Sequence, residues 1–212
     1  VREFTIPSSV DSICACAFCD AKITKVIFND NLKYIGQSSF RSCNSLSGTL
    51  TIPDGVTVIE YDAFAYCGYS AIHLPANLTA LESGIINGSM TSVSIPSSVT
   101  RIGTNAFWNC SGISTIELPS GLTEIESWAF GGTKLTSLSI PDGVTHIGTN
   151  ILSGYSTDNL PNMTFDTESK WYSDSGLNYE IDKETYTTTE GNFDVQKFFQ
   201  INADTEFYKA GD

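Results

Sequence analysis

Residues 95–107 read Ile95-Pro96-Ser97-Ser98-Val99-Thr100-Arg101-Ile102-Gly103-Thr104-Asn105-Ala106-Phe107. The same order recurs seven times with variations: an apolar residue before proline, another three positions after it, then Ile-Gly-x-x-Ala-Phe. The last position of this unit is always apolar and recurs every 21 to 24 residues, at Phe18, Phe40, Phe64, Ile86, Phe107, Phe130 and Leu152. Such a period predicts a solenoid, in which each unit packs only on its neighbours.

Each repeat begins with a segment that alternates apolar and polar residues, for example residues 90–95 and 135–140. This alternation predicts a strand with one buried face. Proline follows in six of the seven repeats and Asn29 in the other. Proline ends strand pairing because it has no amide hydrogen to donate. Since all repeats run in the same direction, we expect the strands to stack in parallel.

The second half of each repeat is predicted to return along the other side of the solenoid. A turn pair such as Asp54-Gly55 opens this half. The apolar residues that follow in the same repeat are expected to point inward: Val56, Ile59, Ala63 and Phe64. A recurring glycine predicts a place where the backbone bends or approaches a neighbour closely, at Gly36, Gly103 and Gly148.

Three of the six cysteines share one position of the repeat, three residues after the phenylalanine, at Cys43, Cys67 and Cys110. This shared position predicts a stacked ladder of buried free thiols. The other three crowd the first repeat, at Cys14, Cys16 and Cys19. A disulfide or a metal is conceivable there. Without a nearby histidine, and with an irregular C-x-C-x-x-C spacing, the first repeat gives little support for zinc.

The string Ile-Pro-x-x-Val-x-x-Ile-Gly-x-x-Ala-Phe-x-x-Cys at residues 95–110 resembles the BspA-like, or Treponema-type, leucine-rich repeat. The resemblance covers residues 1 to about 165. It implies a curved leucine-rich repeat solenoid of the α/β repeat class, made mostly of short parallel β-strands. It also implies an exported bacterial or protist surface protein, from a family that includes adhesins for extracellular-matrix proteins and carries no catalytic residues.

We divide the chain into a solenoid over residues 1–165 and an acidic C-terminal cap over residues 166–212. From residue 160 onward 11 acidic and 4 basic residues give a net charge of -7, against 13 and 7, or -6, for residues 1–159. Residues 160–165 are expected to form a final strand, residues 192–199 a short helix and residues 205–209 a closing strand. Calcium binding by residues 182–194 is an alternative, but the EF-hand spacing is not met.

The net charge of the 212-residue chain is -13, from 11 Lys and Arg against 24 Asp and Glu. This excess argues against phosphate backbones and anionic lipid surfaces, so nucleic acid is not an expected partner. The sequence contains no run of 18 apolar residues that would predict a membrane span. Because the sequence begins inside a repeat, we expect an export signal upstream and a cell-surface or secreted location.

The sequence predicts no catalytic, cofactor or metal site. The two histidines, His73 and His146, occupy different positions of the repeat, and the ladder cysteines are predicted to point inward. The sequence has no glycine-rich phosphate loop, Gly-x-Ser-x-Gly elbow or His-Glu-x-x-His motif. We therefore expect that the chain is not an enzyme and needs no cofactor.

Candidate partner-binding residues lie at positions that the repeat leaves free. His73 and Glu117 are outward strand positions on a face that is otherwise mostly small and polar. Tyr66, Trp108 and Trp128 lie beside the return segment and are predicted to face outward, although such rings can also pack flat over neighbouring repeats. Exposed Tyr and Trp commonly mark contact surfaces for protein or sugar.

These observations predict a non-catalytic recognition module that binds a host extracellular-matrix or cell-surface protein, in adhesion to host matrix or to other cells. Two alternatives stay open at this point. The solenoid could be a structural spacer that displays another domain, or its exposed aromatic residues could capture a glycan.

Overall fold

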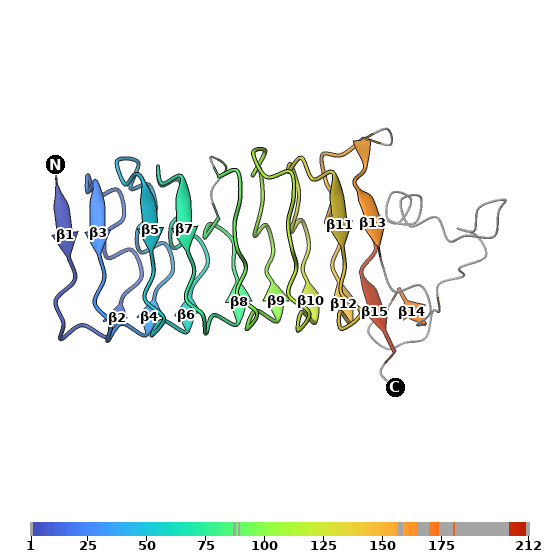
Figure 1. Cartoon of the computed structure of the whole chain (residues 1–212), viewed down its shortest axis with the longest axis horizontal. Helices are drawn as coiled ribbons and strands as arrows, with labels where there is room; N and C mark the ends of the chain where they lie inside the picture. Colours follow the sequence, from blue (N-terminus) through green and yellow to red (C-terminus); the bar gives the residue numbers. More distant parts are fainter. Residues whose placement is uncertain are drawn as a thin grey trace.

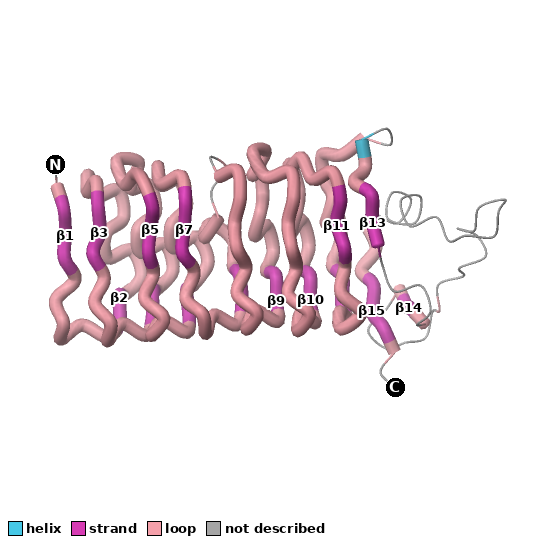
Figure 2. The backbone as a smooth tube through the Cα atoms, viewed as in Figure 1, coloured by secondary structure: helices cyan, strands magenta, loops and turns pink. Residues whose placement is uncertain are grey.

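The computed structural model describes residues 2–86, 88, 90–156, 159–164, 170–173, 180 and 204–210. It is a parallel-strand β-solenoid of about seven turns, as the repeat predicts. Figure 1 shows the rungs following one another along the long axis, and Figure 2 shows short strands joined by loops with almost no helix. Over the described ranges, no helix has the length and apolar character to cross a membrane.

The strands that precede the proline position form a first row. Its members are β1 (Glu3–Thr5), β3 (Lys25–Ile27), β5 (Thr49–Thr51), β7 (Ala71–His73), β11 (Ser137–Ser139) and β13 (Asn162–Thr164). They pair in parallel as β1 with β3, β5 with β7 and β11 with β13. The predicted alternation is confirmed in β11, where Leu138 is buried between two exposed serines, and the predicted strand in residues 160–165 is β13.

The prediction of a strand over residues 90–95 is wrong. Met90 is buried and its next two neighbours are exposed, so the burial pattern broadly follows the sequence, but the segment forms no strand. A strand needs a hydrogen-bonded neighbour. Within the described residues, neither β7 nor the segment 113–118 exchanges backbone hydrogen bonds with residues 90–95. Side-chain periodicity predicts which side is buried but not whether the backbones pair.

A second row of strands runs along the other side. Its members are β2 (Ser12–Ile13), β4 (Tyr34–Ile35), β6 (Val58–Ile59), β8 (Ala80–Leu81), β9 (Arg101–Ile102), β10 (Glu124–Ile125) and β12 (His146–Ile147). They form two parallel sheets, β2-β4-β6 and β8-β9-β10-β12, and the second residue of every strand is buried. The interruption between β6 and β8 falls at the fourth repeat.

The last two strands close the second sheet. β15 (Phe207–Lys209) pairs antiparallel with β12, and β14 (Trp171–Tyr172) pairs antiparallel with β15. The His146 ring stacks on Tyr208 with 4.7 Å between centroids, and Trp171 and Phe207 are buried. The predicted closing strand is therefore confirmed as β15. The helix expected at 192–199 and the acidic stretch 182–194 lie outside the described residues.

A column of phenylalanine rings runs through the core. Phe18, Phe40 and Phe64 stack with centroids 4.9 and 5.2 Å apart, and Phe107 stacks on Phe130 at 5.5 Å. Of these rings, only Phe18 is not fully buried. The column confirms the predicted inward position of the repeat and supplies much of the apolar surface that the solenoid buries.

The predicted cysteine ladder is also confirmed. Cys43, Cys67 and Cys110 are buried, and the first two donate from Sγ to the carbonyl oxygens of Phe18 and Phe40, each at 3.1 Å. Burial raises the pKa of Cys110 to about 12, and a hydrogen bond with Cys43, followed by burial, raises the pKa of Cys67. Cys67 and Cys110 therefore stay protonated and pack as small apolar groups.

Six rungs contain a described six-residue turn whose fourth residue is the repeat phenylalanine or Leu152: residues 15–20, 37–42, 61–66, 104–109, 127–132 and 149–154. Together with residues 83–86 of the fourth rung, these six turns form a surface that we call the turn face. The N–H groups of the second, fourth and sixth residues donate to the carbonyls of the first, third and fifth residues of the next turn. In the fifth repeat the donors and acceptors are Asn105 to Ser127, Phe107 to Ala129 and Asn109 to Gly131.

This ladder requires two left-handed residues in every turn that forms it. The second and sixth residues have φ between 53° and 90° in these six turns. Left-handed backbone is costly for residues with a Cβ, and Asn, Asp and Gly tolerate it best. Most of the positions accordingly hold Ser, Asp, Asn or Gly. Tyr66, with φ of 58°, and Trp128, with φ of 63°, are bulky exceptions.

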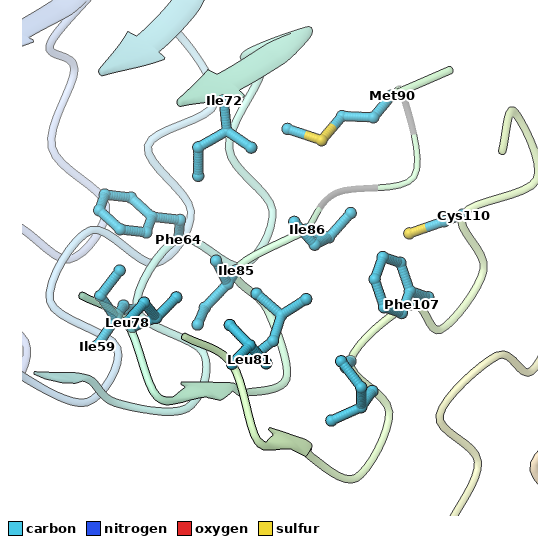
Figure 3. Close-up of a cluster of buried hydrophobic side chains, with 14 of the residues drawn as sticks. Ile59, Phe64, Ile72, Leu78, Leu81, Ile85, Ile86, Met90, Phe107 and Cys110 are labelled. Carbon is cyan, nitrogen blue, oxygen red and sulfur yellow. The ribbon is translucent and has the colours of Figure 1, made fainter. Parts of the chain in front are cut away.

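The fourth repeat interrupts both the ring column and the turn ladder. Ile86 replaces phenylalanine, and Figure 3 shows Ile85 and Ile86 between Phe64 and Phe107. Among the described residues, a 2.6 Å hydrogen bond from Asp62 N to the Ser83 carbonyl is the only backbone bond from the third turn to the fourth, and none joins the fourth turn to the fifth. The buried hydroxyl of Tyr69 donates to the Ile85 carbonyl.

Arg101 links three rungs beside this interruption. It forms ion pairs with Glu82 of the fourth repeat and with Glu126 of the sixth, the latter at 2.6 Å. Burial raises the pKa of Glu82, although Arg101 acts in the opposite direction. Burial would also raise the pKa of Glu126, but hydrogen bonds from Thr104 and Arg101 outweigh it and lower that pKa.

Replacing Phe107 by alanine is expected to cost about 3–5 kcal/mol of unfolding free energy, because the fully buried ring leaves a cavity beside Ile86 and Phe130. Urea unfolding followed by circular dichroism measures the loss. The exposed Ser111 of the same rung offers a control, since S111A should change stability by less than about 0.5 kcal/mol. A similar effect of both substitutions would contradict the assigned ring column.

The E126Q variant is expected to be less stable than the wild type by about 1 kcal/mol near neutral pH. Because the folded state lowers the pKa of Glu126, its stabilising effect is present above the ordinary value of 4.5 and is lost as pH falls. The stabilities of the wild type and E126Q should therefore become equal as pH falls, and thermal unfolding of both proteins across acidic pH measures this difference. The pKa of Glu82 is raised, so E82Q should show the opposite trend with pH, and equal trends would refute the assignment.

Candidate protein-interaction surface

The structure divides the five candidate partner-binding residues between two faces. His73 lies on β7 and Glu117 lies in the segment 113–118, both exposed on the side of the first strand row. They occupy the same repeat position two rungs apart, with Ser94 on the rung between them. Tyr66, Trp108 and Trp128 instead lie on the turn face, so the repeat does not bring the two groups together.

Four aromatic side chains stand out on the turn face. Tyr66 is 67% exposed, Tyr61 49%, Trp108 41% and Trp128 37%. This exposure agrees with the outward orientation expected from the sequence. Large rings that remain in contact with water are the side chains from which interface anchors are commonly made.

The two tryptophans form one unit across neighbouring rungs. Their ring centroids are 5.5 Å apart and the ring planes meet at 71°, an edge-to-face arrangement. Gly131 makes room for Trp108, because a Cβ at residue 131 would lie 2.4 Å from the six-membered ring. The rings thus pack over the neighbouring rung, as the sequence allowed, while still exposing more than a third of each residue.

Tyr66 belongs to a second, charged unit of the same face. The guanidinium carbon of Arg41 lies 5.2 Å from the centre of the Tyr66 ring, within the range of a cation–π interaction. Arg41 Nη1 also lies 2.9 Å from Asp62 Oδ2, which fixes the guanidinium between the ring and the carboxylate. Arginine and tyrosine held in this way enter an interface with less side-chain entropy to lose.

The roles of Arg41 and Asp62 at this surface were not found from the sequence. The sequence does mark the surface itself, because Tyr66 and Trp128 occupy turn positions where the neighbouring repeats hold Ser, Asn, Asp or Gly. A bulky residue in left-handed backbone breaks a local rule of the fold. Such departures are most often retained where they serve function.

The described part of the chain contains no disulfide. All six cysteines are free thiols, with Cys14 and Cys16 exposed and Cys19 half-buried. Over the same residues, no group of three or more His, Cys, Asp or Glu side chains is arranged to hold a metal ion. The disulfide considered for the first repeat is therefore not formed in this structure.

Stacked parallel rungs with an apolar column define a leucine-rich repeat solenoid, and proteins of this class are generally non-catalytic protein-interaction modules. The chain belongs to the BspA-type leucine-rich repeat family. The family model, "BspA type Leucine rich repeat region", matches residues 1–90 and 86–194 with six copies. No curated protein gives a significant match.

Solved structures share the fold. A leucine-rich repeat protein from Bacteroides ovatus is 26% identical with a TM-score of 0.61, over 78% of this chain and 49% of that protein. A leucine-rich cell surface protein from Faecalibacterium prausnitzii is 27% identical with a TM-score of 0.59, over 91% and 53%. A leucine-rich repeat protein from Eubacterium ventriosum, 19% identical with a TM-score of 0.61 over 84% and 47%, shows the fold alone. The chain thus spans about half the length of these proteins.

The Y66N and W128N variants are expected to fold with unfolding free energies within about 1 kcal/mol of the wild type. Relief of a left-handed bulky residue offsets the loss of a cation–π or ring-pair contact of similar size. The W108N variant is the matched control: it loses the same ring pair as W128N without relieving left-handed backbone. In urea unfolding, W108N should be less stable than W128N. The reverse order would contradict the proposed backbone strain at Trp128.

Proposed function

We propose that this chain is a non-catalytic recognition module at the cell surface or in secreted form, and that it binds proteins through its turn face. The observation that carries the proposal is the placement of exposed Tyr66, Trp108 and Trp128, two of them in left-handed positions that disfavour large side chains. The surface location is supported by the name of the Faecalibacterium prausnitzii relative, a cell surface protein.

The physical argument rests on what anchors a protein interface. Trp, Tyr and Arg are enriched among residues that contribute most of the binding energy, and Tyr66 with Arg41 and the two tryptophans provide all three types on one face. By contrast, the outward positions of the first strand row are mostly Ser and Thr. The net charge of -13 favours a partner with a basic surface, which would be steered toward the chain.

The partner we propose is an extracellular-matrix or cell-surface protein of a host or neighbouring cell. An extended row of rungs presents a long surface that suits a large, repetitive partner better than a small ligand. Binding of such a partner by an exported surface protein would serve adhesion to the host or to the neighbouring cell.

We further propose that residues 166–212 cap the solenoid that residues 1–165 form. The support comes from β15, which covers the edge of β12, and from Trp171 and Phe207, which are 2% and 1% exposed at that end. A terminal unit that covers the last rung keeps the apolar column away from water. The cap would cover the end of the solenoid and would leave the turn face, which runs along its side, open to a partner.

Binding is tested with purified chain against immobilised matrix proteins, mucins and whole cells, with affinities measured for every positive partner. The Y66A/W108A/W128A variant should bind at least about tenfold more weakly, since each lost anchor costs on the order of 1–2 kcal/mol. The H73A/E117A variant, altered on the strand face, should bind like the wild type. Unchanged affinity of the aromatic variant would reject the turn face, and silence across the panel would count against adhesion.

A further inference from the structure

The turn face contains a cleft of about 610 Å³ at the fourth repeat, a size typical of small-molecule sites. The third and fifth rungs form its walls, through Asp62 and Tyr66 on one side and Asn105, Trp108 and Asn109 on the other. Ser83, Gly84 and Ile86 of the fourth rung also line it. The cleft is therefore one rung wide.

Gly84 lets the fourth rung approach the third closely at the edge of the cleft. At the second turn position the third and fifth repeats have Asp62 and Asn105, whereas the fourth has Gly84. A Cβ on Gly84 would lie 2.6 Å from the Asp62 Cα, and the glycine has φ of 73°, so no other residue fits there without strain. The position of Asp62 on the cleft wall therefore requires glycine at residue 84.

The interrupted turn ladder leaves polar groups in this cleft without partners. In the complete turns the second and fourth residues donate to the next rung, but within the described residues the N–H groups of Gly84 and Ile86 donate to no acceptor. The side-chain amides of Asn105 and Asn109 likewise make no hydrogen bond to the described protein. Each of these groups favours a ligand that can accept or donate a hydrogen bond.

The apolar and charged components of the cleft narrow the class of ligand. Tyr66 and Trp108 provide aromatic surface on opposite walls. The carboxylate of Asp62 is already paired with Arg41 at 2.9 Å and accepts a hydrogen bond from Ser83 Oγ at 3.3 Å, so the rim carries no unpaired charge. A charged ligand would find no counter-ion here, and an apolar side chain would leave the amides without partners.

We propose that this cleft binds a neutral sugar ring of a glycan. A pyranose has an apolar C–H face that stacks on aromatic rings, and its hydroxyl groups both donate and accept hydrogen bonds around the rim. These properties match the aromatic side chains of Tyr66 and Trp108, the unpaired Asn105 amide and the two free N–H groups. The proposal goes beyond protein recognition by the turn face: the cleft shares Tyr66 and Trp108 with that surface, but its binding groups also include Asn105 and the N–H groups of the fourth rung.

A second cleft, of about 620 Å³, provides a contrast near the C-terminal end of the solenoid. There the Tyr155 hydroxyl lies 2.8 Å from Thr133 Oγ1 and accepts a hydrogen bond from the N–H of Leu135 at 2.6 Å. These two hydroxyl groups and the Leu135 N–H are therefore already paired with one another. Lys134 also lines this cleft and gives it a positive charge, so it is less suited to a neutral ligand than the cleft at the fourth repeat.

The test uses methyl pyranosides of glucose, galactose, mannose and N-acetylglucosamine, together with an array of neutral oligosaccharides. Saturation-transfer NMR detects binding and calorimetric titration gives the affinity. The wild type should bind at least one of these sugars. The W108A and N105A variants should bind it at least about tenfold more weakly, the effect of losing one ring stack or one hydrogen-bonding side chain.

Matched variants separate this site from the rest of the turn face. Y61A and the strand-face variant H73A/E117A change exposed residues that do not line the cleft, so their sugar affinity should equal that of the wild type. A wild type that binds no sugar on the array, or a W108A and an N105A variant that both bind as well as the wild type, would overturn the proposal.

A separate experiment distinguishes binding of protein by the turn face from binding of sugar by the cleft. Each protein partner found is measured before and after enzymatic removal of its glycans. Binding that persists without glycans and is lost in W128A belongs to the protein surface. Loss of binding on glycan removal, together with wild-type affinity in Y61A and weak affinity in N105A, supports the sugar cleft.

Discussion

The structure depends on hydrogen bonding of each rung's backbone to the next rung. In the six-residue turns, alternate N–H groups point along the solenoid, and this requires left-handed backbone at the second and sixth residues of each turn. The constraint selects small or short polar side chains at those positions. It therefore also makes a deviation conspicuous, because a Trp or Tyr there carries a conformational cost that packing in the core does not explain.

Much of the fold is readable from the sequence because inward positions are chosen by hydrophobicity and recur with the period. Phe107, Cys110 and the strand at Ser137–Ser139 all follow from this rule. Backbone pairing between rungs is different, since it depends on how far two rungs are apart, and this is why residues 90–95 have an alternating pattern without forming a strand. The sequence shows that Trp128 differs from the small residues at the same turn position, but its left-handed φ is a property of the turn and is seen only in the structure.

The fourth repeat shows how one substitution pattern affects several layers of the structure. Ile86 interrupts the ring column, Gly84 permits a close approach of the fourth turn to Asp62, and the second-row sheets separate between β6 and β8 at the same level. Compensation lies close by: the Tyr69 hydroxyl serves the Ile85 carbonyl, and Arg101 ties Glu82 to Glu126 across the neighbouring rungs. A polar opening is thus tolerated beside a continuous apolar core.

The turn face is the side of this solenoid on which side chains can change at least cost. In β5 and β11 of the first row a buried leucine lies between two exposed Thr or Ser residues, and the second row holds an inward isoleucine or leucine in every strand. The first and fifth turn residues, in contrast, contribute mainly their backbone and are not left-handed, so a large side chain such as Tyr61, Arg41 or Trp108 fits there without disturbing the core. Variation of these residues from repeat to repeat would give such a scaffold its specificity, while the ladder beneath keeps the rungs in register.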